Sequence, residues 1–216
     1  MSALFPPSSN TIFRVISLAL LATPVLAIGA AYIYLGSPYY TGQNDPIDQT
    51  FQFDHRHHVS DDGIDCRYCH SSVESSPYAG IPSTAVCMNC HAQVWNKSPL
   101  LEQLRARYFR GEPIPWNRVH RLPNFVYFNH AIHVNKGVGC VSCHGRVDRM
   151  AMIEQVEPLT MNWCLDCHRD PAKHVRPLQL ITDMTWQPEG DPEHAGKELL
   201  QKYDVHTRTS CTTCHR

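Results

Sequence analysis

The chain has 216 residues, of which 43% are hydrophobic and 18% are charged, and its formal net charge is −1. This length predicts one domain or two small ones, and four Trp, nine Tyr and seven Phe indicate a globular rather than a disordered protein. The near-zero charge argues against nucleic acid as a partner. The ten cysteines and fourteen histidines are more unusual than the charge balance.

The first predicted element is a membrane-spanning helix over residues 15–35. This stretch, VISLALLATPVLAIGAAYIYL, is 21 residues long and uncharged, which suffices to cross about 30 Å of hydrocarbon. Because Arg14 precedes it, we expect residues 1–14 to form a cytoplasmic tail and everything after Leu35 to lie on the outer side. Pro24 predicts a kink near the centre of the helix.

The alternative for this stretch is a cleaved signal peptide, since small residues such as Ala27 and Ala31 suit a processing site. The apolar run is longer than the roughly 7 to 15 residues of a signal-peptide core. We therefore expect an uncleaved anchor that keeps Met1. Residues 36–50, GSPYYTGQNDPIDQT, are predicted to form a turn-rich tether.

Residues 51–216 contain five copies of a Cys-x-x-Cys-His motif, which use all ten cysteines. Two cysteines one helical turn apart suit thioether bonds to the vinyl groups of a haem, and the adjacent histidine suits its iron. The sequence therefore predicts five haems c. The attachment cysteines are Cys66, Cys69, Cys87, Cys90, Cys140, Cys143, Cys164, Cys167, Cys211 and Cys214, and the proximal histidines are His70, His91, His144, His168 and His215.

Zinc sites, disulfides and redox dithiols are the alternatives for a Cys-x-x-Cys pair. None of them requires a histidine directly after the second cysteine, yet one follows in all five copies, so the pattern favours haem. Five haems in about 166 residues leave little polypeptide per cofactor. We therefore expect the porphyrins to make up most of the core.

Two stretches of this domain repeat one another. Residues 53–70 read FDHRHHVSDDGIDCRYCH and residues 128–144 read FNHAIHVNKGVGCVSCH, one residue shorter. We interpret them as two copies of a di-haem module. The expected fold is a mostly irregular and α-helical multihaem cytochrome c, with di-haem modules over residues 51–91 and 128–170, a connector over 92–127 and a fifth-haem segment over 171–216.

Two short helices are predicted outside the motifs, and strands are scarcely indicated. Residues 100–109, LLEQLRARYF, have amphipathic spacing, and Gly111 with Pro113 should end that helix. Asp191 and Pro192 are typical of a helix start, and this second helix should run to about Tyr203.

Each module opens with a Phe-x-His-x-x-His segment, whose histidines we expect to be distal iron ligands. Three-residue spacing places both imidazoles of a pair on one helical face, so one can cap the haem bound just downstream and the other a neighbouring haem. These ligand candidates are His55, His58, His130 and His133. His57 breaks the spacing and is expected at the surface or beside a propionate. An iron with histidine on both faces has no open position, so its chemistry is the transfer of one electron.

Methionine is the alternative distal ligand and would raise the haem potential. The candidates lie in apolar contexts, where packing against haem is the commoner role. They are Met88, Met150, Met152, Met161 and Met184.

The fifth distal ligand must come from outside the two histidine pairs. His206 stands five residues before Cys211, a reach of at most ~18 Å that makes the approach around a haem edge strained. His174 and His194 lie in polar segments, where a solvated histidine is the default. His120 lies in the apolar, proline-stiffened stretch WNRVHRLPNF, so we predict His120, followed by His206 and His174, with a methionine last.

The segments IDCRYCHSSVE, AGIPSTAVCMNCHAQVW, residues 126–145 and LTMNWCLDCHRDP resemble the pentahaem cytochrome c component of bacterial alternative complex III. The similarity covers nearly all the chain beyond Phe51, together with the single N-terminal helix. Each Phe-x-His-x-x-His module is more loosely similar to class III cytochromes of the c3 and c7 type. The Trp-x-x-Val-His-x-Leu-Pro run also resembles the pattern of the pentahaem component, which implies a ligand role for His120.

This resemblance implies an electron-transfer wire in a quinol-oxidising complex of the bacterial inner membrane, with its haem domain in the periplasm. The implied partners are a quinol-oxidising polytopic membrane subunit, an iron–sulfur subunit similar to molybdopterin enzymes, a monohaem cytochrome c subunit, and a soluble electron carrier or terminal oxidase. The chain would bind no quinol by itself, and no catalytic residue is assigned to it.

Two other functions stay open at this point. A self-contained membrane-anchored multihaem quinol dehydrogenase also has one N-terminal helix, but the fifth haem and the duplicated histidine pairs count against it. A catalytic multihaem reductase would need a haem with an open coordination position. No motif here replaces the proximal histidine by lysine, the substitution that would suggest a catalytic haem.

Overall fold

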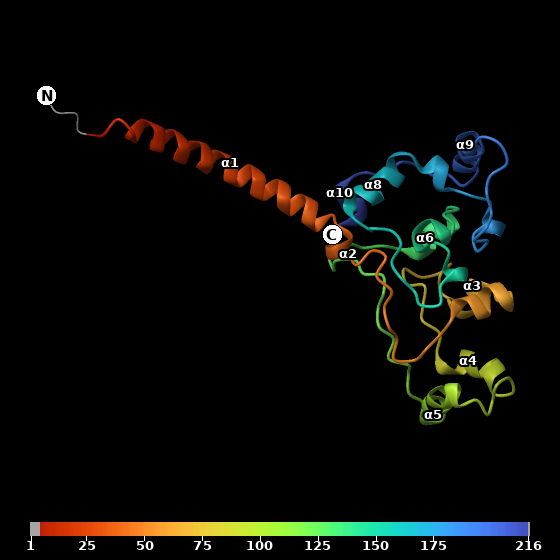
Figure 1. The fold of residues 1–216 in the computed structure, drawn as a ribbon. Helices are drawn as coiled ribbons and strands as arrows, with labels where there is room; N and C mark the ends of the chain where they lie inside the picture. Colours follow the sequence, from red (N-terminus) through yellow and green to blue (C-terminus); the bar gives the residue numbers. More distant parts are fainter. Residues whose placement is uncertain (1–4, 216) are drawn as a thin grey trace. The chain divides into compact units, whose positions relative to one another are not determined.

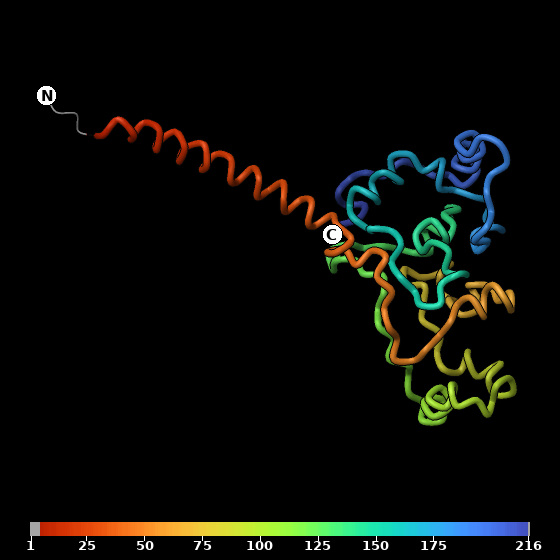
Figure 2. The backbone as a smooth tube through the Cα atoms, viewed as in Figure 1, coloured from red at the N-terminus to blue at the C-terminus, as the bar shows by residue number. Residues whose placement is uncertain are grey.

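The computed structural model describes residues 5–215, and the chain forms two compact units that divide between Gly42 and Gln43. Figure 1 shows the helices of both units, and Figure 2 follows the backbone through them. The expected retention of Met1 and the first four residues of the predicted tail fall outside the described residues.

The first unit consists of α1 (Ser9–Leu35) and the short α2 (Pro38–Thr41). α1 begins before the predicted start at Val15, because the uncharged polar residues ahead of the apolar run also form helix. The helix continues through Pro24, and none of its side chains is buried. Among residues 5–215 it is the helix that is long and apolar enough to cross a membrane. The predicted apolar N-terminal helix is confirmed.

The second unit is built from short helices joined by irregular segments. Its α-helices are α3 (Cys66–Cys69), α4 (Thr84–His91), α5 (Glu102–Arg110), α6 (His130–Asn135), α7 (Val141–His144), α8 (Met161–Arg169), α9 (Pro192–Lys202) and α10 (Cys211–Cys214). Single turns of other helix types cover Arg56–Asp61 (π) and Pro99–Leu101, Val147–Arg149, Pro171–His174 and Leu178–Leu180 (3₁₀). Extended pairing within residues 43–215 is limited to isolated bridges, which confirms the mostly helical and irregular fold.

The two helices predicted outside the motifs are confirmed together with their ends. Gly111 terminates α5 in the left-handed conformation, with φ of 67°, which a residue without a Cβ adopts at little cost. Asp191 caps α9, because its carboxylate accepts a hydrogen bond from the backbone N–H of Glu193, and Pro192 occupies the first helical position.

The predicted tether differs from the structure in its second half. The compact second unit already begins at Gln43, because this segment pairs with distant parts of the chain. Gln43 forms a parallel bridge with Gln155, and the backbone N–H of Asn44 donates to the carbonyl of Gln155 over 2.8 Å. Further along, the side-chain amide of Gln49 donates to the carbonyl of Asn117.

The side-chain core of the second unit is small and divided into two clusters. One consists of Phe51, Met88, Leu104 and Ile114, and the other of Val73, Val134 and Ile181. Leu104 from α5 is the most deeply buried of these, at 1% exposure. Such clusters bury little apolar surface for a unit of this length, so side chains alone do not supply an ordinary layered core.

Candidate haem-binding sites

Four of the Cys-x-x-Cys pairs lie within one helical turn, on α3, α4, α8 or α10, and in the fifth Cys140 is the N-cap of α7, which contains Cys143. Residues three apart share a helix face, so both thiols of each pair point to the same side. Two of these short helices carry an N-cap. Asp65 accepts from the N–H of Arg67 at the start of α3, and Thr160 accepts from the N–H of Trp163 at the start of α8.

The histidines that close the motifs share one feature, which is that Nδ1 is already engaged. Four of them donate this N–H to a backbone carbonyl, and carbonyls accept only, so Nδ1 carries the proton and Nε2 keeps its lone pair for iron. The pairs are His70 with Gly80 (2.7 Å), His91 with Val94 (3.1 Å), His168 with Arg208 (2.9 Å) and His215 with Phe125 (3.1 Å).

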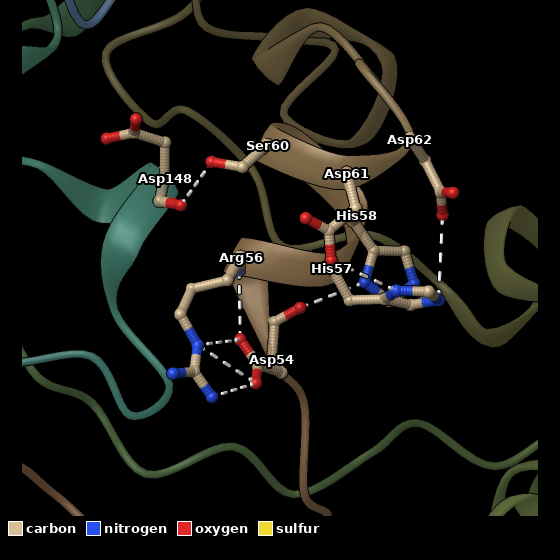
Figure 3. A network of polar contacts seen from close by, with 8 residues as sticks. All are labelled: Asp54, Arg56, His57, His58, Ser60, Asp61, Asp62 and Asp148. Carbon is tan, nitrogen blue, oxygen red and sulfur yellow. Dashed lines mark hydrogen bonds and ion pairs between the residues drawn. The ribbon is translucent and has the colours of Figure 1, made fainter.

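The first Phe-x-His-x-x-His segment forms a π-helical turn in which both histidines contact the phenylalanine. The Phe53 ring stacks on His58, with centroids 4.5 Å apart, and meets His55 edge to face at 4.7 Å. Nδ1 of His58 donates to the backbone carbonyl of Asp54 over 3.0 Å, as Figure 3 shows. The Asp54 carboxylate is held in turn by the Arg56 guanidinium, at 2.7 Å.

The second segment repeats this geometry on α6. Phe128 stacks on His133 at 4.5 Å and meets His130 edge to face at 4.8 Å. Nδ1 of His133 donates to the carbonyl of Asn129 over 2.7 Å, the counterpart of the His58 contact. The predicted repeat is thus a repeat of side-chain geometry as well as of sequence.

The second histidine of each pair faces a proximal histidine. The ring centroids of His58 and His91 are 6.1 Å apart, and those of His133 and His168 are 6.0 Å apart. Two imidazoles on opposite sides of one metal, each bound at about 2 Å, have their ring centroids about 6 Å apart. The spacing therefore fits one iron between the members of each pair.

The first histidine of each pair lies towards the other proximal residues. His130 is parallel to His144, with centroids 6.4 Å apart and an interplanar angle of 8°. Its Nδ1 donates to the carbonyl of Pro77, which again leaves Nε2 free. Nδ1 of His55 is buried without a hydrogen-bond partner among residues 5–215. Burial, followed by the neighbouring His70, lowers the pKa of His55 to about 4, so it is neutral, the form that binds a metal.

His120 lies against His144, with Nε2 3.2 Å from Nδ1 of His144 and ring centroids 4.4 Å apart. The contact gives His144 the Nδ1 partner that the other proximal histidines find in a carbonyl. It also engages the Nε2 atom that His120 would use to bind an iron. The prediction that His120 ligates the fifth iron stays a prediction, and this contact does not favour it.

The other histidines are more exposed. His57 lies 3.6 Å from Asp61 and 3.7 Å from Asp62, as in Figure 3, and stacks on Trp95. His194 and His206 are exposed beside acidic side chains, and His174 is exposed and lines a pocket with Arg176 and Trp186. None of these contacts singles out a distal ligand for His215.

The structure offers two tests of whether haem fits these sites. The first is the spacing of the histidine pairs, since His58 with His91 and His133 with His168 leave room for one iron between their rings. Among residues 5–215, no three His, Cys, Asp or Glu side chains converge on a site for a bare metal ion. Arg176 provides the second test. Its guanidinium is buried beside Gly139, next to Cys140, and its Nε has no partner in the described part of the chain. A buried cation of this kind suits a carboxylate such as a haem propionate. The residues present fit haem.

Reasoning from sequence missed the carbonyls that hold the histidine rings, those of Gly80, Val94, Arg208 and Phe125. Every residue carries such a carbonyl, so no residue type marks them. The sequence does single out the two phenylalanines that contact the histidine pairs, because Phe53 and Phe128 occupy equivalent positions in the two copies of the repeat.

Comparisons with known proteins agree with the geometry. Residues 126–216 match the family described as cytochrome c7 and related cytochrome c. The chain is also 38% identical over 180 residues to the multihaem cytochrome c subunit of a menaquinone reductase from Nitratidesulfovibrio vulgaris, and the match covers 78% of this chain and 77% of that protein. The chain therefore belongs to the family of multihaem cytochrome c subunits that includes this relative.

Proposed function

We propose that this chain is the membrane-anchored electron-transfer subunit of a quinol or quinone oxidoreductase complex. The facing histidine pairs carry the proposal, because His58 opposite His91 and His133 opposite His168 leave no coordination position for a substrate. Haem c, when bound, supplies one-electron redox chemistry at a potential tuned by its axial ligands and surroundings. The polypeptide attaches the haems, fixes both axial imidazoles and holds the sites close together.

We propose five haems, whose irons are bound by five proximal and four distal histidines. The ten cysteines attach the haems, and the five motif histidines bind the irons from the proximal side. His58, His130 and His133 are the proposed distal ligands of the second, third and fourth motifs, on the evidence of their ring contacts with His91, His144 and His168. His55, whose Nδ1 is buried without a partner among residues 5–215, is the proposed distal ligand of the first. The fifth distal ligand is left between His120 and the exposed histidines.

The proposed location is the cell membrane of a bacterium, with the haem unit outside the cytoplasm. α1 supplies the single span, and Arg14 near its N-terminal end favours a cytoplasmic N-terminus.

At a finer level we propose quinol oxidation within an alternative complex III. The resemblance in the motif segments and around His120 supports it. The proposed partners are a polytopic quinol-oxidising subunit, an iron–sulfur subunit similar to molybdopterin enzymes, a monohaem cytochrome c and a soluble carrier or terminal oxidase. The chain's role would be to pass electrons from the site of quinol oxidation to that acceptor.

A second candidate is the reverse direction, with electrons passing to a quinone. The relative from Nitratidesulfovibrio vulgaris favours it, because that protein is a subunit of a menaquinone reductase. Paired imidazoles permit transfer either way, so the partners and the haem potentials set the direction.

The deciding experiment is purification of the complex from native membranes and identification of the subunits that accompany this chain. A polytopic subunit with a monohaem cytochrome supports the alternative complex III assignment. A complex that lacks the monohaem subunit and reduces menaquinone faster than it oxidises menaquinol supports the second candidate.

The self-contained dehydrogenase is tested on the isolated full-length chain in detergent. We expect dithionite to reduce all its haems, while quinol alone gives no steady turnover, since one helix forms no closed quinone pocket. Steady quinol oxidation by the isolated chain would overturn the proposed role.

A further inference from the structure

The haem motifs contact one another in an order that differs from their order in the sequence. Between the second and first motifs, the side-chain amide of Asn89 in α4 donates to the hydroxyl of Tyr68 in α3 over 3.2 Å. This hydrogen bond places the second motif beside the first. The turn that carries His55 and His58 joins the same two sites.

The first motif also contacts the third. Val73, three residues after His70, belongs to a buried cluster with Val134 and Ile181, and Cys140 packs against this cluster. Two adjacent residues bridge the same motifs, since Thr182 donates to the Asp65 carboxylate over 2.7 Å and the carbonyl of Ile181 accepts from the N–H of Cys140.

A second bridge between the first and third motifs comes from α6. Both the backbone N–H and Nδ1 of His130 donate to the carbonyl of Pro77, at 3.2 and 2.9 Å, and the side chain of Asn135 donates to the carbonyl of Glu74. Glu74 and Pro77 lie four and seven residues after His70, the last residue of the first motif. The first motif therefore lies between the second and the third.

The third, fourth and fifth motifs follow in chain order. One turn of α6 carries His130, which faces the third motif, and His133, which faces the fourth. The fourth and fifth are joined because His168 donates to the carbonyl of Arg208, three residues before Cys211.

The connector explains how the chain reaches this order. After α5 it runs back beside the segment that follows Gly42, as Figure 2 shows in green and orange. Thr50 donates to the carbonyl of Pro115 over 2.8 Å, and Asn117 donates to the carbonyl of Asp48 over 2.7 Å. The second motif therefore lies at one end of the set of sites. The connector then brings the chain back, so that the third motif lies beside the first.

We propose that the five haem sites form one unbranched line in the order second, first, third, fourth and fifth motif, so that electrons enter and leave at the second and fifth. The proposal rests on the proposed electron-transfer function. Solvent exposure supports it independently, because Cys90 in the second motif and Cys211 in the fifth are the exposed cysteines of the ten. The ends of the line are thereby accessible to partners.

The test compares two matched variants that each lose one haem. In the native complex, Cys66→Ala with Cys69→Ala removes the haem of the first motif, and Cys87→Ala with Cys90→Ala removes that of the second. Intact mass confirms that each variant retains four haems. Stopped-flow absorbance then follows haem redox change, with quinol driving it from one end of the line.

The proposed order predicts opposite kinetics for the two variants. Loss of the first site separates the second from the other three, so haem reduction splits into a fast and a slow phase in a one-to-three or three-to-one ratio. Loss of the second site removes only an end, so the retained haems stay contiguous. The sequence order predicts the reverse, and a split in the second-motif variant alone would overturn the proposal.

If either variant fails to accumulate, the iron positions in a cryo-EM map of the wild-type complex decide. The second-motif iron should have the first-motif iron as its nearest neighbour, and the third-motif iron should lie nearer to the first than to the second. A second-motif iron between the first and third would overturn the order. Absence of any reduction by quinol or of any transfer to quinone in the wild-type complex would instead contradict the proposed function.

Discussion

Replacement of His133 by Ala should convert one haem to a high-spin, ligand-accessible form without releasing it. The His133 imidazole faces His168 across 6.0 Å and is held by the Asn129 carbonyl. Its neighbour His130 lies on the side of His144, so it is not placed to substitute. His168 and the two thioethers would remain. With five motifs in the chain, about one fifth of the total haem should change.

The assay is the high-spin fraction in the electron paramagnetic resonance spectrum, together with the amount of carbon monoxide bound per haem by the reduced protein. His58→Ala is the matched variant in the first module and should change one haem to the same extent. His57→Ala is the control, because His57 pairs with Asp61 and Asp62 at the surface and should leave the spectrum unaltered. Fully low-spin spectra in both His58→Ala and His133→Ala, with all haem retained, would refute the assigned ligands.

Three further predictions concern mass, core packing and pH. The intact mass should equal the chain with Met1 retained plus five haems, and a mass fitting four haems or a start near Ala31 would contradict the corresponding part. Leu104→Ala should lower the free energy of unfolding by about 2–4 kcal/mol, measured by denaturant titration of the haem-loaded protein, whereas the exposed Leu100→Ala should cost almost nothing. The hydrogen bond from Arg67 lowers the pKa of Asp65 to about 2, so its contribution is present above pH about 4 and is lost as the pH falls towards 2. Because the pair is about two-fifths exposed, this contribution should stay below about 1 kcal/mol, and Asp65→Asn should flatten the stability profile over that pH range.

Local sequence signals were sufficient to predict the helix ends that are set by a capping residue. Gly111 and Asp191 act within one turn of their own helices, so the ends of α5 and α9 follow from neighbouring residues. The start of α1 was placed too late, because apolarity marks the part of a helix suited to lipid rather than its first turn. The histidine pairs were also visible, since the spacing that puts two rings on one face is itself local.

Long-range contacts could not be predicted in the same way. The pairing of Gln43 with Gln155 draws half of the predicted tether into the haem unit, and neither residue has a neighbour that signals it. The apolar setting of His120 agrees with its half-buried position, but it does not distinguish a ligand of iron from a partner of a ligand. The contact between Nε2 of His120 and Nδ1 of His144 bears on this question, and it joins residues 24 positions apart that no local pattern connects.

The duplicated segment also explains why the order of the haem sites in space differs from the order of their motifs in the sequence. Each Phe-x-His-x-x-His turn joins two sites locally, but a chain of more than two sites needs a link between modules. That link uses the first histidine of the second module, because His130 donates to the Pro77 carbonyl of the first module while its ring faces His144. Pro77 lies seven residues after His70 and ten before Cys87, and Asn135 donates to the carbonyl of Glu74, four residues after His70, so the first motif is the one held against the second module. His130 is therefore both a proposed iron ligand and a contact between the two modules. Replacing it should disturb the coordination of one iron and the order in which the sites exchange electrons.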